Sequence, residues 1–436
     1  VIEECGSNSQ FKQRVRRAIA AVSAPKSLSS LVKRQLAGLA RGTKFYPASA
    51  AGELSDKLDE VRRAILSEVA PLNVGDALEL CERFLAIHSK VFERVDDSFG
   101  VIWPVFTQAI RDFATLYGRL ENYDRRRLAE TVLAWYTNDN YGIYDKVIQD
   151  FGNALGDEGL NRLEELLKQN QGHKDNTVSL KSLSHQQRVG GLLQIADVRR
   201  NVDEYITLIQ TELGNTNDYQ LLGIAERLLL ADRCEEALEW LEKIDKSSHR
   251  THEKQRLQIQ ALEGLGKAAE AQELRIEKFL DFPDIDSYKE CLTSSESSEQ
   301  LKEELLQAAT TYKYPSITLF LFTNLGEIKR AAALVRQHRE VWNGRNYREL
   351  QPAAKQLAKA WPLEATILYR ALIEDIVERA RSKYYHHAVR YLKALESLTA
   401  QIDDWEDIPT HEMYFDGLRE SHKRKRGLWS KYDSKK

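Results

Sequence analysis

Few residues in this chain of 436 stand at the spacing that metal binding requires. His411-Glu412 begins like the zinc-protease motif H-E-x-x-H, in which two histidines one helical turn apart bind the metal. Position 415 is Phe, so the second ligand is missing. The His386-His387 pair has no cysteine or acidic partner close by, and we interpret one ring as packed and the other as solvated. We therefore expect no metal and no other cofactor.

One stretch matches the end of a phosphate-binding loop. Gly266-Lys267 has the last two residue types of that loop, but Ala268 stands in place of the Ser or Thr and Ala261 in place of the upstream glycine. A loop without that hydroxyl and that glycine loses both the metal contact and the close approach of its backbone to phosphate. We interpret this stretch as a turn between helices.

Another stretch has acids and a lysine near the spacing of metal-dependent nucleases. Pro283-Asp284 is followed by Asp286 and Lys289. Nuclease chemistry needs these groups on adjoining strands, and the pattern here predicts a turn that leads into a helix. No G-x-S-x-G nucleophile elbow is present either. The sequence gives no support to an enzyme, and a non-enzyme is the expectation.

Acidic and amide side chains precede a predicted helix at Asp96, Asp97 and Ser98, and an Asn-Asp-Asn run echoes them at 138–140. Such side chains can ligate a hard cation, but they also cap helix N-termini by accepting backbone N–H bonds. No third or fourth acidic ligand follows at the spacing of a calcium loop. We therefore favour capping, and keep Asp96 and Asp97 as candidate interaction residues.

The last fifteen residues form the one strongly basic segment. They contain seven lysine and arginine residues against Asp433: Lys423, Arg424, Lys425, Arg426, Lys431, Lys435 and Lys436. Together with Trp429, they could follow a phosphate backbone and stack on bases. Alternatively, Trp429 covers the last hydrophobic face of a helical stack while the cations solvate its outer side. The balanced overall charge favours the second interpretation.

The elements that must position these residues are helices related by a repeat. Ala237 and Ala271 are 34 residues apart, and the pairs Leu228/Leu262 and Glu236/Glu270 match at the same offset. This period is that of a helix-turn-helix unit stacked on its neighbours, with a small residue where two helices approach closely. Ala331 and Ala388 occupy the same kind of place further along, at offsets of 60 and 57.

Helical periodicity runs through almost the whole chain. Five apolar residues spaced by three or four positions predict one helical face, which Pro71 ends: Leu54, Leu58, Val61, Ile65 and Val69. Four prolines mark predicted helix starts, because proline in the first turn loses no hydrogen bond: Pro104, Pro352, Pro362 and Pro409. The helix after Pro362 should extend for about five turns toward Ser382.

A polar stretch divides this helical pattern. We predict an N-terminal helical region over 1–170, a linker or loop over 171–187, and a C-terminal tetratricopeptide-like region over 188–436. In the first region Asp-x-Phe-Gly at 97–100 is echoed by Asp-x-Tyr-Gly at 139–142, and this offset of 42 is typical of a HEAT-like helix pair.

Composition restricts the class of protein and its partners. Hydrophobic residues make up 42% of the chain, enough for a substantial core, and 66 acidic against 63 basic residues give a net charge of −3. No global charge attracts nucleic acid or membrane, and no run is long enough to span a bilayer. The four cysteines, Cys5, Cys81, Cys234 and Cys291, are far apart and predict buried thiols in a reducing compartment, so the cytoplasm is expected. Because the chain begins at Val1 and its only methionine is Met413, we expect a processed or truncated start.

Several blocks of the sequence resemble a known family. These are Glu93–Gly100, Trp361–Ala365, Tyr385–Leu392 and Gly427–Trp429. They are similar to an uncharacterised family of bacterial proteins, a domain of unknown function whose C-terminal blocks are also found behind SWIM-type zinc fingers. The cysteine and histidine set of such a finger is absent, so the resemblance implies no zinc. It implies an all-α, tetratricopeptide-like fold and no established activity.

The sequence thus predicts an all-α, right-handed α-solenoid of tetratricopeptide-like and HEAT-like helix pairs. We expect a non-catalytic scaffold that binds a protein or peptide partner along a concave face. Two alternatives stay open: a nucleic-acid-binding adaptor that uses the basic tail, and an enzyme whose acidic residues converge only in the folded chain.

Overall fold

The computed structural model describes residues 17, 25–120, 122–169, 183–214, 216–245, 248–293 and 299–434. Their regular structure is helical, and the β-type pairing among them is one isolated bridge between Tyr46 and Val95. The prediction of an all-α protein is confirmed. None of the described helices combines the length and the apolar composition that crossing a lipid bilayer requires.

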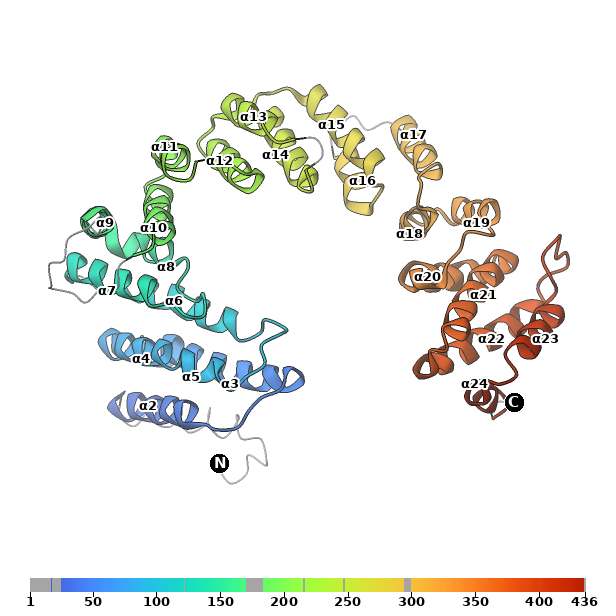
Figure 1. The fold of residues 1–436 in the computed structure, drawn as a ribbon, viewed down its shortest axis with the longest axis horizontal. Coiled ribbons are helices and arrows are strands. Elements are labelled where there is room, and N and C mark those ends of the chain that lie inside the picture. The colour runs from blue at the N-terminus through green and yellow to red at the C-terminus, as the bar shows by residue number, and fades with distance from the viewer. Residues whose placement is uncertain are drawn as a thin grey trace. The chain divides into compact units, whose positions relative to one another are not determined.

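The chain forms two compact units, Val1–Ala231 and Asp232–Lys436, and each is described by itself (Figure 1). The helices of the first unit are α2 (Pro25–Arg41), η2 (Ala48–Ala50), α3 (Ala51–Ala64), η3 (Ile65–Val69), α4 (Val74–Ala86), α5 (His88–Phe92), α6 (Trp103–Tyr117), α7 (Arg125–Thr137), α8 (Val147–Asp150), α9 (Gly152–Gln169), α10 (His185–Val198), α11 (Val202–Glu212) and α12 (Asp218–Leu230). The helices of the second unit are α13 (Cys234–Glu242), α14 (Thr251–Gly264), α15 (Ala268–Asp281), α16 (Ile285–Leu292), α17 (Glu299–Thr310), α18 (Pro315–Leu325), α19 (Ile328–Gln337), η4 (Gly344–Asn346), α20 (Tyr347–Leu357), α21 (Pro362–Glu378), η5 (Ser382–Tyr384), α22 (Tyr385–Thr399), α23 (His411–Ser421) and α24 (Arg426–Asp433).

The boundary between the units differs from the loop predicted at 171–187. Part of that loop, residues 171–182, lies outside the described residues. Helix α10 begins inside the predicted loop, at His185, and packs against both α9 and α11. The apolar core of the first unit extends from Leu28 to Ile195 without a break at the loop, so this unit continues through α12.

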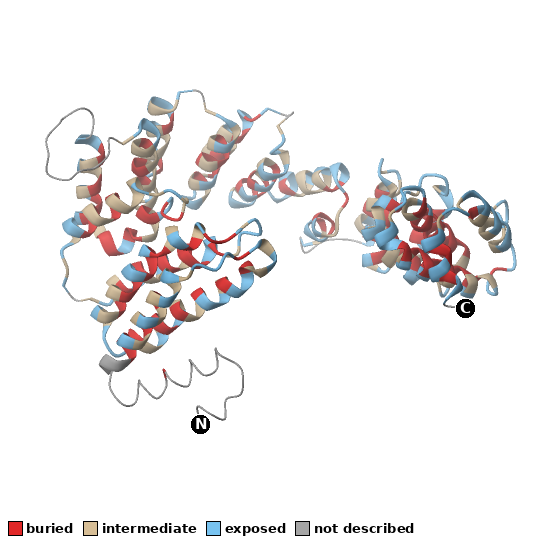
Figure 2. Ribbon diagram, turned by 60° about the horizontal axis from the view of Figure 1, so that its bottom comes forward, coloured by how far each residue is buried: buried red, intermediate tan, exposed pale blue. Residues whose placement is uncertain are grey.

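The stripe of five apolar residues predicted over 54–69 forms as expected. It runs along α3 and its π-helical continuation η3, and each residue is at most 4% exposed: Leu54, Leu58, Val61, Ile65 and Val69. A turn follows at Ala70 and Pro71. Buried residues lie on the faces that helices turn toward their neighbours (Figure 2).

The predicted helix starts hold at three of the four prolines. Pro104 and Pro362 lie in the first turn of α6 and α21, and Pro409 lies just before Thr410, whose side chain caps α23. The prediction for Pro352 is wrong, because α20 already begins at Tyr347 and the proline lies inside it. A helix tolerates an internal proline where the lost hydrogen bond is offset by packing, and the neighbouring Ala353 and Ala354 are fully buried.

The four alanines of the predicted repeat share one local position. Each is the fourth residue of its helix and 0% exposed: Ala237 in α13, Ala271 in α15, Ala331 in α19 and Ala388 in α22. In three of these cases a residue with positive φ lies five positions earlier: Asp232, Gly266 and Gly326. A left-handed residue terminates the preceding helix and lets the chain turn back. The alanine then lies in the first turn of the next helix, on its buried face.

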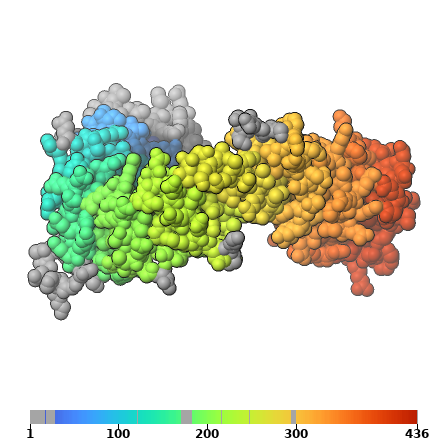
Figure 3. Space-filling model, turned by 90° about the horizontal axis from the view of Figure 1, so that it is seen from above, coloured from blue at the N-terminus to red at the C-terminus, as the bar shows by residue number. Residues whose placement is uncertain are grey.

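Helices in each unit pack mainly on helices one or two places away in the chain. The pairs α7/α9, α4/α6, α14/α15, α20/α21 and α21/α22 make extensive contacts. In the space-filling view each unit accordingly shows bands of colour in chain order (Figure 3). The predicted buried thiols are confirmed for Cys81, Cys234 and Cys291, whereas Cys5 lies outside the described residues.

Candidate functional site

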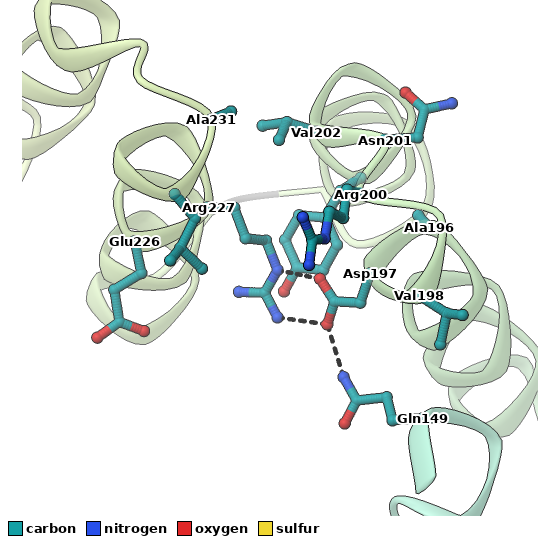
Figure 4. Close-up of a pocket in the computed structure, with 12 residues that line it drawn as sticks. Gln149, Ala196, Asp197, Val198, Arg200, Asn201, Val202, Glu226, Arg227 and Ala231 are labelled. Atoms are coloured by element: carbon teal, nitrogen blue, oxygen red, sulfur yellow. Dashed lines mark hydrogen bonds and ion pairs between the residues drawn. The ribbon is translucent and has the colours of Figure 1, made fainter. Parts of the chain in front are cut away.

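A pocket of about 620 Å³ lies in the first unit, where the ends of α10 and α11 face α12 (Figure 4). This volume falls within the range of roughly 300–1,000 Å³ that is typical of ligand sites. Apolar side chains form much of its wall, including Val198 and Val202 beside the turn and Leu230 at the end of α12. We take this pocket as the candidate functional site.

The pocket occurs where the helix hairpin departs from the alanine pattern. Arg200, in the turn that follows α10, is in the left-handed region, with φ at +54°. The residue five positions later, the fourth of α11, is Tyr205 and not an alanine. Because a phenol ring needs far more room than a methyl group, the ring of Tyr205 meets α12 at this point, and the helices leave space beside it.

An ion pair across the pocket fixes its polar side. Arg227 of α12 donates from Nη2 to Asp197 Oδ2 at 2.6 Å and from Nε to the other carboxylate oxygen (Figure 4). Gln149 Nε2 donates to Asp197 Oδ2 at 2.7 Å, and the Arg227 guanidinium lies 3.9 Å from the ring centre of Tyr205. Arg227 Nη1 also donates to the Gly223 carbonyl at 2.7 Å. These contacts hold both charged groups in one geometry.

The surroundings of Arg227 and Tyr205 keep each side chain in its usual protonation state at neutral pH. Burial disfavours the charge of Arg227, but its hydrogen bonds and attraction to Asp197 outweigh burial and raise the pKa of the guanidinium. Burial also raises the pKa of the Tyr205 hydroxyl above its ordinary value of 10. Near neutral pH the arginine therefore stays charged and the tyrosine neutral, so they contribute a fixed charge and a ring rather than proton transfer.

Two exposed side chains at the rim of the pocket, Leu230 and Arg200, could contact a ligand. Leu230 is 89% exposed. Arg200 is exposed too, and within the described part of the chain its guanidinium has no hydrogen-bond or ion-pair partner. An exposed leucine and an unpaired cation next to an apolar cavity can receive an apolar side chain that lies beside an acidic one.

Asp96 and Asp97, which the sequence singles out as an acidic pair, accept backbone hydrogen bonds in the loop before α6. Asp97 accepts hydrogen bonds from the backbone N–H groups of Val101, Ile102 and Trp103 at 2.7–3.1 Å. Asp96 accepts from the Ser98 hydroxyl and from Ser98 N at 3.1 Å, and these two bonds lower the pKa of its carboxyl. Across the described ranges, no three His, Cys, Asp or Glu side chains are grouped to hold a metal ion.

The echo of this loop has the same construction. Asp139 accepts from Tyr141 N at 3.0 Å and from Tyr144 N at 2.5 Å, and Gly142, like Gly100, has positive φ. The two loops also touch, because Trp103 Nε1 donates to the Gly142 carbonyl at 3.2 Å. The 42-residue echo in the sequence thus corresponds to two neighbouring capped turns.

The basic tail is divided between structural and exposed residues. Trp429 is 6% exposed, and its indole N–H donates to the His422 carbonyl at 2.9 Å. Lys425 Nζ donates to the Val377 carbonyl at 2.6 Å, at the end of α21, and Lys423 pairs with Glu420. Arg424 and Arg426 are exposed. The tail therefore belongs to the packed end of the second unit and still presents cations on its surface.

The other motif fragments take structural positions. Gly266 is a left-handed turn residue, and Asp284 caps α16 by accepting from Ser287 N at 2.7 Å. His411 lies against Phe415, the residue that replaces the second zinc ligand. Of the adjacent histidines, His386 is exposed, whereas His387 is half-buried and accepts a hydrogen bond from Arg390 at 3.0 Å.

The residues of the candidate site could not be predicted from the sequence. Asp197 and Arg227 are 30 residues apart on different helices, and neither belongs to a motif. The sequence near the site departs from the pattern of the other turns: Arg200 stands at the left-handed position, and Tyr205, five positions later, stands where three other helices have a buried alanine. The offset from Tyr205 to Ala237 is 32, so a search at a period of 34 passes it over.

A family model described as DUF6880, a family of unknown function, matches residues 1–431. No curated protein and no solved structure matches the chain.

Proposed function

Since the chain belongs to the DUF6880 family of unknown function, we propose from its structure that it is a non-catalytic scaffold that binds a segment of a partner protein. The repeated combination of a left-handed residue and a buried alanine supports a right-handed solenoid of tetratricopeptide-like pairs, with HEAT-like pairs in the first unit. Stacked helix pairs of this kind use their long surfaces to bind other chains. Buried free thiols support a cytoplasmic location as part of the same proposal.

The observation that carries the proposal is the pocket beside α12 with Leu230 at its rim. Covering a fully exposed leucine is worth roughly 1.5–3 kcal/mol, and the side chain here is 89% exposed. Arg200 adds a cation at the same rim that a carboxylate can pair with. We infer that the partner segment inserts an apolar side chain into the pocket next to an aspartate or glutamate.

Peptides selected from a random display library on the full chain test this proposal. We expect the selected peptides to share an apolar residue close to an acidic one. Leu230→Asp should weaken their binding by about tenfold or more, because it removes an apolar contact and repels the acidic residue. Fluorescence anisotropy of a labelled peptide measures the dissociation constant.

Leu72→Asp is the matched control, since Leu72 is 47% exposed in the same unit but lies outside the pocket. It should bind the peptides like the parent. Thermal unfolding of both variants checks that they fold. Selected peptides that bind equally well to the parent and to Leu230→Asp would show that the pocket is not the binding site.

A further inference from the structure

A second pocket, of about 200 Å³, lies in the second unit among α20, α21 and α22. Each of its two walls has residues at i, i+3 and i+7, which share one helical face: Gly344, Tyr347 and Gln351 on one side, and Tyr384, His387 and Tyr391 on the other. Leu372 and Ile376 of α21 form the floor. Ligand sites that enclose a whole small molecule measure roughly 300–1,000 Å³, so this pocket fits one ring of a larger ligand.

Aromatic rings in this pocket lie nearly parallel to one another. The rings of Tyr384 and His387 are 6.2 Å apart at 25°, and those of His387 and Tyr391 are 6.3 Å apart at 22°. Tyr384 and Tyr347 are 49% and 51% exposed, so part of each side chain is accessible at the mouth of the pocket. Arg390 donates to His387 Nδ1, and burial lowers the pKa of this histidine, which keeps the wall uncharged at neutral pH.

The acidic residue in this pocket, Asp375, is already paired with two arginines. Asp375 accepts from Arg379 at 3.3 Å and lies 3.6 Å from Arg381, and its side chain is 8% exposed. A cationic ligand would have to displace these arginines. The pocket therefore favours a neutral ring over a cation.

Two segments beside the pocket are rich in basic residues. Residues 378–390 and 422–426 contain eight lysines and arginines against one acid, Glu378: Arg379, Arg381, Lys383, Arg390, Lys423, Arg424, Lys425 and Arg426. Lys383, Arg424 and Arg426 are exposed, and in the residues that the structure describes their side chains have no ion-pair partner.

Contacts at the end of α21 bring the tail to the pocket. Lys425 donates to the carbonyl of Val377, the residue after Ile376 on the pocket floor. A side chain at Gly427 would lie 3.9 Å from the ring of Tyr385, the neighbour of Tyr384. The tail and the 379–384 turn thus both lie at the C-terminal end of α21, next to the pocket.

We propose that these two basic segments and the pocket bind single-stranded nucleic acid. One base stacks on Tyr384 and Tyr347 in the pocket, while phosphates pair with Lys383, Arg424 and Arg426. Alternation of rings and cations is the pattern that binds single strands without reading their sequence. An acidic peptide would satisfy the cations but would leave the parallel rings without a partner. This site is separate from the pocket beside α12, and neither proposal depends on the other.

Fluorescence anisotropy with a labelled twenty-nucleotide oligothymidylate, titrated with the full chain, tests the proposal. An abasic oligonucleotide of the same length carries the same phosphates without bases. We expect it to bind about 5- to 150-fold more weakly, the factor that stacking of one base gives. Equal affinity for the abasic strand, or tighter binding of poly-glutamate than of the oligonucleotide, would overturn the proposal.

Two sets of variants separate stacking from charge. The double variant Tyr347→Ala, Tyr384→Ala should lose the preference for bases, whereas Tyr384→Phe should keep it, because the ring is retained. Tyr314→Ala is the control, since Tyr314 is 53% exposed in the same unit but outside the pocket. Binding that is unchanged in the double variant would contradict the stacking model.

The triple variant Lys383→Ala, Arg424→Ala, Arg426→Ala should weaken binding of all single strands and reduce the slope of log affinity against log salt by about 2, at about 0.7 per phosphate contact. Its control replaces three exposed lysines of the same unit, Lys289, Lys329 and Lys359, with alanine. Equal salt slopes for the two triple variants would show that these cations do not contact phosphates. Circular dichroism melts confirm that each variant folds.

Discussion

Single residues decide how closely neighbouring helices can pack in this chain. The spacing of 34 residues between Ala237 and Ala271 predicts that both lie at helix contacts, and both are buried, as are Ala331 and Ala388 at offsets of 60 and 57. Tyr205 could not be predicted in the same way. Its role depends on contact with Arg227. This arginine is 22 positions further along the chain, in the following helix α12, and its guanidinium lies 3.9 Å from the centre of the Tyr205 ring.

Ala271→Leu tests one of these contacts. Ala271 is fully buried with Ile259 and Leu262, so three added carbon atoms should overpack the contact between α14 and α15 and cost roughly 1–3 kcal/mol of unfolding free energy. Chemical denaturation measures the loss. Ala269→Leu, at an exposed position of the same helix, is the control and should be near neutral. Equal midpoints for the two variants would contradict the packing described for α15.

Trp429→Ala should destabilise the second unit by roughly 3–5 kcal/mol, the cost of removing a buried aromatic side chain. Its ring lies 5.9 Å from that of Phe415 and 6.3 Å from that of Tyr432. Thermal and urea unfolding of the full chain report the change. If the variant melted like the parent, Trp429 would not be part of the core at the end of this unit.

Helices and the loops before them were predictable where the signal is local. Capping by Asp97 follows from residue type and position alone, and so does the buried face of α3. The start of α20 was not predictable, because Pro352 marks a first turn by its chemistry while packing of Leu350, Ala353 and Ala354 extends the helix back to Tyr347.

Asp97→Ala should lower the stability of the first unit by about 1–2 kcal/mol, because the backbone N–H groups at the start of α6 lose their acceptor. Asp96→Ala is the comparison, since Asp96 is exposed and its carboxylate accepts hydrogen bonds from Ser98 within its own turn. It should cost clearly less. Denaturation curves that rank the two variants in the reverse order would contradict the assigned roles.

Three histidines on α22–α24 should make the second unit sensitive to mild acid. Burial, together with nearby cations, lowers the pKa of His387, His411 and His422 below the ordinary 6.5. The unfolded chain then binds these protons at a higher pH than the folded chain, so stability is full above about pH 7 and falls as the pH drops through 6.5. Unfolding at pH 7.5 and 5.5 measures the difference. A triple His→Gln variant should show a smaller loss, and an equal loss would contradict this assignment.

At the scale of the whole molecule, the all-helical class follows from the sequence, but the division of the chain does not. A polar stretch predicts a loop, yet it carries no information on whether the helices on either side of it pack together, as α9 and α10 do. The candidate site could not be predicted for a similar reason. Asp197, Arg227 and Gln149 converge only when three helices are stacked.

The most direct test of the proposed scaffold function is the affinity of the full chain for its selected peptide when Arg200 is replaced by glycine. Glycine adopts the left-handed conformation of this position without the strain of a side chain, so Arg200→Gly should unfold at the same or a higher temperature than the parent. The cation at the rim is removed at the same time. We expect the dissociation constant to rise by about tenfold while stability is kept; an unchanged dissociation constant in this well-folded variant would contradict binding at the pocket beside α12.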